Sequence, residues 1–166
     1  MSTTHEVRAI APEVVETLRE RDDAGRAPLA RTDHGGGSPM RCCLRRSAPG
    51  EQIMLVSYAP LRRWAARTGA DPGPYDECGP VFVHAGECGG PVDGPGYPTA
   101  LHGARRVLRS YHARGHILGG RLVELPMERA AEVDGLLREV LADPEVALVH
   151  MRAVEYGCFL AEAHRR

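Results

Sequence analysis

The order of strand-like and helix-like segments limits the fold of this chain more than any other feature. Stretches that are apolar, or that alternate between apolar and polar residues, predict strands at residues 5–10, 41–46, 52–58, 81–83, 106–112, 116–125, 146–154 and 157–164. Apolar residues at helical spacing predict two main helices, over 12–21 and from Pro126 to about Leu141, and a short helix over 61–67. Because strands dominate and helices come singly, we predict an α+β fold with a mainly antiparallel or mixed sheet.

The turns and long connections complete this prediction. The Pro-Gly turn within 47–50 predicts a hairpin of the segments on either side of it, and the turn at 113–115 predicts a second hairpin. Residues 22–39 are polar and end in a glycine-rich run, which predicts a flexible connector or lid. Residues 86–98 form a loop rich in glycine and proline, long enough to suggest a functional or mobile segment. The chain of 166 residues is expected to form a single domain, 1–166.

Composition excludes several classes of function. All 21 basic residues are arginine, so a Schiff base to pyridoxal phosphate and the lysine of a P-loop are excluded. We attribute the arginine bias to GC-rich coding, as in many actinobacteria, rather than to function. A net charge of −1 argues against nucleic-acid binding. No apolar run is long enough for a membrane span, and the first residues lack a signal-peptide pattern, so we expect a cytoplasmic protein. In a reducing cytosol the five cysteines are expected to stay free.

The stretch from Cys78 to Cys88 is the most informative part of the chain for function. A short apolar strand, 81–83, ends by delivering His84 and then Cys88 into the glycine- and proline-rich loop. Reactive side chains at the junction of a rigid element and a loop are a common way to build a site. Cys88 has no apolar surroundings in the sequence, so the alternatives for it are a functional thiol and an inert surface thiol.

Several blocks of the sequence resemble a known family. They are residues 41–44 with Ala48-Pro49-Gly50-Glu51, the run Gly79-Pro80-Val81-Phe82-Val83-His84, and residues 146–152 with Cys158-Phe159. Together they resemble DUF1203, a bacterial family of unknown function, from about Pro39 to the C-terminus. Many members of that family have Pro-Cys-Arg-x-Cys where this chain has Pro39-Met40-Arg41-Cys42-Cys43, and many have an amide-rich segment in place of Glu155-Tyr156-Gly157. The resemblance implies no particular activity.

Four residues are candidates for catalysis: His84, Cys88, His150 and Cys158. A cysteine nucleophile needs a nearby base, and the pairs Cys88 with His84 or Cys158 with His150 would supply one. The alternative for Cys158 is a packed strand residue.

The cofactor is unknown from the sequence. His84 and Cys88, with Cys43, Cys78, Cys158 or His150, could hold a zinc ion, although the absence of Cys-x-x-Cys makes buried, metal-free cysteines the favoured interpretation. Cys42 and Cys43 are predicted to point to opposite faces of one strand, so that at most one of them reaches a shared site.

Three further residues are candidates for binding an anion. Arg109 and Tyr111 share one face of their strand, as His150 and Arg152 share a face of theirs. Two arginines and a phenol could clamp a carboxylate or phosphate. The alternative is an exposed sheet face with cross-strand pairs to Glu155 or Glu162.

The predicted function is therefore that of a small-molecule enzyme or metabolite-binding protein, with a pocket of histidine, arginine and cysteine for an anionic ligand. A non-catalytic protein-interaction domain and a structural zinc domain are the alternatives. We expect a small-molecule ligand, with no nucleic-acid or membrane partner, and a homodimer is compatible with the sequence.

Overall fold

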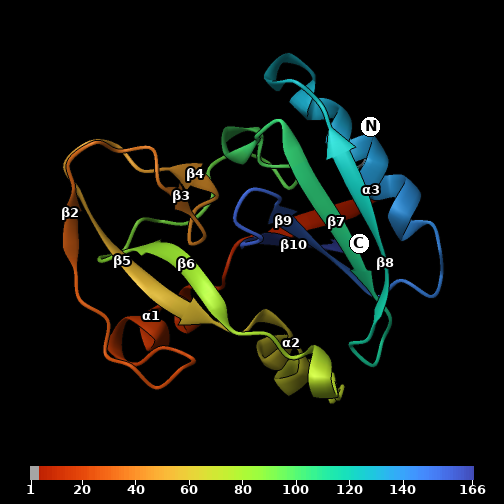
Figure 1. Ribbon diagram of the computed structural model, residues 1–166, viewed down its shortest axis with the longest axis horizontal. Helices are drawn as coiled ribbons and strands as arrows, with labels where there is room; N and C mark the ends of the chain where they lie inside the picture. The colour runs from red at the N-terminus through yellow and green to blue at the C-terminus, as the bar shows by residue number, and fades with distance from the viewer. Residues whose placement is uncertain (1–3) are drawn as a thin grey trace.

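The computed structural model describes residues 4–166, whose strands form two five-stranded sheets (Figure 1). The first sheet has the order β1-β10-β9-β7-β8 and is antiparallel throughout. Its strands are β1 (His5–Arg8), β10 (Phe159–Arg165), β9 (Leu148–Ala153), β7 (Arg105–Tyr111) and β8 (Ile117–Glu124). The second sheet has the order β2-β5-β6-β3-β4, in which β3 and β6 are parallel and the other pairs antiparallel. Its strands are β2 (Arg31–Asp33), β5 (Glu51–Tyr58), β6 (Gly79–His84), β3 (Pro39–Met40) and β4 (Arg45–Arg46).

The α-helices are α1 (Pro12–Glu20), α2 (Pro60–Thr68) and α3 (Val133–Leu141), and the 3-10 helices are η1 (Gly73–Tyr75), η2 (Thr99–Leu101) and η3 (Met127–Glu132). Helix α3 packs against the first sheet, α1 packs against β5 of the second sheet, and α2 contacts Tyr111 and Leu148 of the first sheet (Figure 1). Helices α1 and α2 begin with a proline, and α3 follows the 3-10 helix η3, which is preceded by Pro126. The fixed φ of proline favours the start of a helix. None of these helices is long and apolar enough to span a bilayer, in the range 4–166.

Three apolar clusters hold these elements together. In α3, Val133, Leu137 and Leu141 are buried against the first sheet. In α1, Val15 and Leu18 are buried in the core of the second sheet. The third cluster joins Leu61 and Trp64 of α2 to Tyr111 and Leu148 of the first sheet. Burial of one such leucine contributes roughly 1.5–3 kcal/mol, so each contact of helix and sheet adds a large share of the net stability.

The predicted α+β fold is confirmed, and the structure adds two features to it. The strands divide between two sheets, and the short segment over 61–67 forms a full third helix, α2. The hairpin around the 113–115 turn is confirmed, because β7 and β8 pair antiparallel, with one register shift between Ser110 and Tyr111. Residues 86–98, predicted as a loop, contain no helix or strand.

The predicted hairpin of 41–46 with 52–58 is wrong. Residues 41–44 form a turn, and β4 pairs back onto β3, while β5 pairs with β2 and β6. The physical reason is the run of three apolar residues 42–44, which lacks the alternation of a strand and is buried as a compact turn. Strand β2 pairs with β5 instead. It lies within the segment 22–39, which the sequence predicted as a connector or lid.

Candidate metal centre

The turn between β3 and β4 places two adjacent thiols in the interior. The turn has a hydrogen bond from the Leu44 nitrogen to the Met40 carbonyl at 3.0 Å, and Leu44 has a left-handed φ of 57°. Cys42 and Cys43 are only 6% and 3% exposed. The prediction that these cysteines point to opposite faces of a strand is wrong, because the backbone here curves through a turn and directs both sulfurs to one side.

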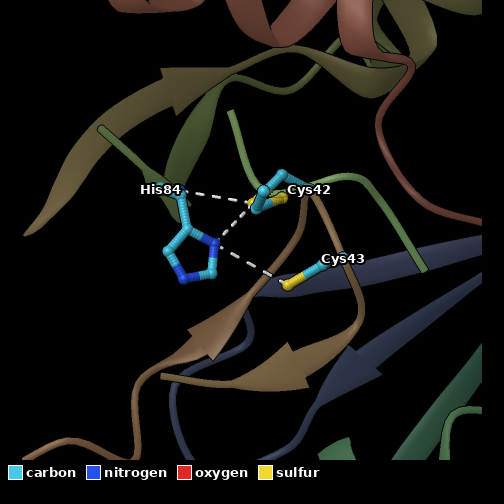
Figure 2. A group of neighbouring side chains, drawn as sticks. Cys42, Cys43 and His84 are labelled. Atoms are coloured by element: carbon cyan, nitrogen blue, oxygen red, sulfur yellow. Dashed lines mark hydrogen bonds between the residues drawn. The ribbon is translucent and has the colours of Figure 1, made fainter. Parts of the chain in front are cut away.

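His84, the last residue of β6, faces both of these sulfurs. Its Nδ1 lies 3.3 Å from Cys42 Sγ and 3.7 Å from Cys43 Sγ, and its backbone nitrogen donates a hydrogen bond to Cys42 Sγ at 3.3 Å (Figure 2). The His84 side chain is almost fully buried. Parallel pairing of β3 with β6 brings the turn beside the end of β6, so this contact follows from the sheet order.

Cys88 completes the cluster from the loop that follows β6. It is partly buried and packs against the core of the second sheet. One donor atom from each of Cys42, Cys43, His84 and Cys88 lies within 4.8 Å of the other three. Arg19 of α1 fixes the intervening backbone, because its Nε donates to the His84 carbonyl at 2.9 Å and its Nη2 donates to the Gly86 carbonyl at 2.7 Å.

Glu51 orients the His84 ring from its other side. Glu51 Oε2 lies 3.0 Å from His84 Nε2, and its side chain is 35% exposed. The carboxylate also accepts a hydrogen bond from the Ala48 nitrogen, and this bond and the His84 contact lower the pKa of Glu51. An ionised carboxylate only accepts, so Nε2 carries a proton, and in the neutral form of the ring the lone pair of Nδ1 faces the sulfurs.

The thiols of Cys42 and Cys43 influence each other's acidity. Contact with Cys43 and burial raise the pKa of Cys42, whereas contact with Cys42 lowers the pKa of Cys43.

The donor set fits a tetrahedral metal ion. Bonds of about 2.3 Å to four tetrahedral donors separate the donors by about 3.8 Å from one another. The distances from His84 Nδ1 to the sulfurs of Cys42 and Cys43, 3.3 Å and 3.7 Å, are close to that value. No two of the four donor atoms are more than 4.8 Å apart, so metal binding would bring any pair closer by about 1 Å at most. Beside the cluster is a cavity of about 530 Å³, which is bordered by Cys42 and Cys88 and by the first residues of α1. The cluster thus has a route to solvent.

Sequence reasoning placed His84 and Cys88 together but missed Cys42 and Glu51. The signal for Cys42 was the unbroken apolar run 42–44 between arginines, which is atypical of a strand. No sequence signal identifies Glu51, since its role depends on the pairing of β5 with β6.

His150 lies in a different part of the core. It is fully buried, its Nε2 is 3.1 Å from Glu162 Oε1, and its ring packs on Tyr111 and Phe159 at centroid distances of 4.8 Å and 5.0 Å. Burial lowers the pKa of His150, although Glu162 acts in the opposite direction. Cys158, its predicted partner, lies in the connection between β9 and β10 with its sulfur 3.7 Å from the Tyr156 carbonyl oxygen.

Arg109, Tyr111 and Arg152, the predicted anion clamp, do come together. The carboxylate of Glu77 lies between the two arginines, 2.9 Å from Arg109 Nη1 and 3.1 Å from Arg152 Nη2. Burial raises the pKa of the Tyr111 hydroxyl beside Arg109. A carboxylate of the chain itself therefore occupies this clamp. Arg152 and Cys158 border a cavity of about 220 Å³ that shares no lining residue with the cavity at Cys88, so the candidate residues fall into separate groups.

Comparison with known proteins agrees with the resemblance seen in the sequence. The model of the family described as "Protein of unknown function (DUF1203)" matches residues 37–165, which include the whole cysteine and histidine cluster. No curated protein and no solved structure matches the chain.

Proposed function

Because the chain belongs to the DUF1203 family, whose description names no activity, we propose a function from the cluster itself: Cys42, Cys43, His84 and Cys88 bind one soft divalent metal ion. Three sulfurs and one imidazole nitrogen are the donor set of many tetrahedral zinc sites, and thiolates select zinc over magnesium or calcium. The structural zinc domain was an alternative from the sequence, and the donor geometry now favours it over the small-molecule enzyme.

One observation carries the proposal: four donor atoms from three separate segments lie within 4.8 Å of one another. Cysteines that merely fill a core need only apolar neighbours. Here the sulfurs instead surround the lone pair of a histidine whose opposite nitrogen is held by a carboxylate, and this arrangement of carboxylate, histidine and donor is typical of metal ligands.

The metal would tie the 41–44 turn to the end of β6 and to the loop that carries Cys88. In this role His84 and Cys88 act as ligands, in place of the base and nucleophile predicted from the sequence. Four protein ligands describe a structural site, which fixes the loop by closing chain segments over one ion. A reducing compartment such as the cytoplasm keeps the three thiols available and suits the proposal.

The test uses the full chain, reduced and stripped of metal, titrated with Co²⁺ as a spectroscopic substitute for Zn²⁺. We expect one equivalent to bind, with the sulfur-to-cobalt charge-transfer and intense visible bands of a tetrahedral thiolate site, and Zn²⁺ to displace it. The chain supplies its own matched controls, because Cys78 and Cys158 lie outside the cluster.

Cys43→Ser and Cys88→Ser should each weaken metal binding strongly and reduce the charge-transfer absorbance by about one third, whereas Cys78→Ser and Cys158→Ser should change neither. The proposal fails when the reduced protein binds no Co²⁺ or Zn²⁺ at micromolar concentration, or when the control substitutions reduce the absorbance as much as the cluster substitutions do.

A further inference from the structure

A third cavity, larger than the two described above, lies where the two sheets meet. Its volume is about 620 Å³, within the range of pockets that hold small organic molecules. One part of its wall is apolar and includes Leu55, Phe82 and Leu160. The other part carries three arginines from both sheets, Arg41, Arg46 and Arg106.

These three arginines have too little negative charge around them. Glu155 is the single acidic residue among the described residues that line this cavity. Three guanidinium groups and one carboxylate give the lining a net charge of +2. Glu155 is itself 51% exposed and stands 3.5 Å from Arg106 Nη1, a weak pairing. Burying a charge is costly unless a counter-charge accompanies it.

Arg41 and Arg106 are nevertheless 3% and 5% exposed. Their guanidinium groups are held mainly by backbone carbonyls, since Arg41 Nε donates to the Phe159 carbonyl at 2.8 Å and Arg106 Nη2 donates to the Leu101 carbonyl at 2.7 Å. Within residues 4–166, Arg106 Nε is buried without any hydrogen-bond acceptor. The cavity wall thus carries an excess of positive charge, and two of its three arginines are almost fully buried, so an anion in the cavity would supply the missing counter-charge.

Comparison with Arg109 and Arg152 decides which arginines are available. Those two share Glu77, at 2.9 Å and 3.1 Å, so a carboxylate already neutralises them in part. Within residues 4–166, Arg41, Arg46 and Arg106 have no carboxylate within hydrogen-bonding distance other than that of Glu155. An anionic ligand, predicted from the sequence at Arg109 and Arg152, is therefore better matched to Arg41, Arg46 and Arg106.

We propose that this cavity binds an organic carboxylate with an apolar body, the carboxylate toward Arg41 and Arg106 and the apolar part against Leu55, Phe82 and Leu160. The planar guanidinium group matches a carboxylate in a two-bond geometry. The apolar wall would give little affinity for a small inorganic anion and favours a ligand with a hydrocarbon portion. None of the four proposed metal ligands lines this cavity, although Arg41 belongs to the same turn as Cys42 and Cys43.

The test measures binding of octanoate to the full chain by calorimetry, with 1-octanol and acetate as matched probes. Octanol keeps the apolar body without the charge, and acetate keeps the charge without the body. We expect octanoate to bind at least about tenfold more tightly than either, because charge-assisted hydrogen bonds are worth roughly that factor or more. Equal affinity for octanoate and octanol, or no heat of binding with octanoate at millimolar concentration, overturns the proposal.

Variants then locate the site. Arg106→Gln should weaken octanoate binding about tenfold or more, and Arg105→Gln, at the exposed neighbouring position, should leave it unchanged. Arg46→Gln and Leu55→Asp alter exposed positions of the same wall, so they keep the test valid where Arg106→Gln does not fold. Both should weaken octanoate binding, and wild-type affinity in both would place the ligand elsewhere and refute the proposal.

Discussion

Replacing Glu51 with glutamine should weaken zinc binding without removing a ligand. Glu51 Oε2 is 3.0 Å from His84 Nε2, while His84 Nδ1 is the nitrogen that faces the sulfurs. A carboxylate can only accept a hydrogen bond, so it holds the proton on Nε2 and leaves the lone pair on Nδ1. A glutamine amide whose NH₂ group faces Nε2 would favour the opposite tautomer, with the proton on the nitrogen that should bind the metal.

The size of the effect follows from the geometry of the pair. Loss of a carboxylate behind a metal-bound histidine typically reduces metal affinity by about 10- to 100-fold, or about 1.4–2.7 kcal/mol. The Glu51 side chain is 35% exposed, so solvent screens part of its charge and the lower half of that range is expected. The carbonyl end of the glutamine can still accept from the Ala48 nitrogen, so the turn itself should remain folded.

The assay is competition for Zn²⁺ against a chromophoric chelator at pH 7, and the control is Glu87→Gln. Glu87 borders the neighbouring cavity beside Cys88 and carries the same charge, but it is not a partner of His84. We expect Glu51→Gln to lose about tenfold or more in affinity and Glu87→Gln to lose less than about twofold. Equal losses in the two variants would mean that general charge governs affinity, and wild-type affinity in Glu51→Gln would refute the role of the tautomer.

Two further predictions concern stability. Burial alone would raise the pKa of Glu162, but hydrogen bonds with His150 and His164 outweigh burial and lower it to about 2. Because the folded pKa is the lower one, this stabilisation is complete above the ordinary value of 4.5 and is lost as the pH falls toward 2. Urea unfolding at pH 7 and pH 3 should show a larger loss for the wild type than for Glu162→Gln, and equal losses would contradict the assignment. Gly36→Ala should destabilise the protein more than Gly25→Ala by at least about 1 kcal/mol. Both positions have positive φ, but an added Cβ meets a backbone nitrogen at 2.8 Å at Gly36 and nothing within 4 Å at Gly25; equal changes in the free energy of unfolding would show that φ alone sets the cost.

The sequence predicted individual strands and helices well because their signals are local. The alternation of β7 and β8, the turn between them and the apolar stripe of α3 all depend on residues close in the chain. The division into two sheets was not predictable in this way, because it depends on which strands become neighbours. The partner of β5 is β2, a strand of three residues in a polar segment whose composition suggested a connector.

The candidate site was predictable only in part for the same reason. His84 and Cys88 are four residues apart and could be paired from the sequence alone. Cys42 lies beside them because β3 pairs in parallel with β6. The spacing of apolar residues in the sequence does not predict this pairing. In the predicted anion clamp, the alternation of residues along the strand put Arg109 and Tyr111 on one face. Glu77 belongs to an irregular segment, so its ion pairs with Arg109 and Arg152 could not be predicted from the sequence.

The turn 41–44 contributes residues to both the proposed metal centre and the proposed anion cavity. Its tight curvature explains how four consecutive side chains reach different parts of the protein. Arg41 lines the cavity between the sheets, Cys42 and Cys43 face His84, and Leu44 is buried in the core of the first sheet. A strand would have sent alternate residues to only two faces. The turn instead directs side chains in three directions, at the cost of a left-handed Leu44. A metal held by Cys42 and Cys43 would fix the backbone that positions Arg41, so the same ion would also pre-organise the guanidinium group for its anion.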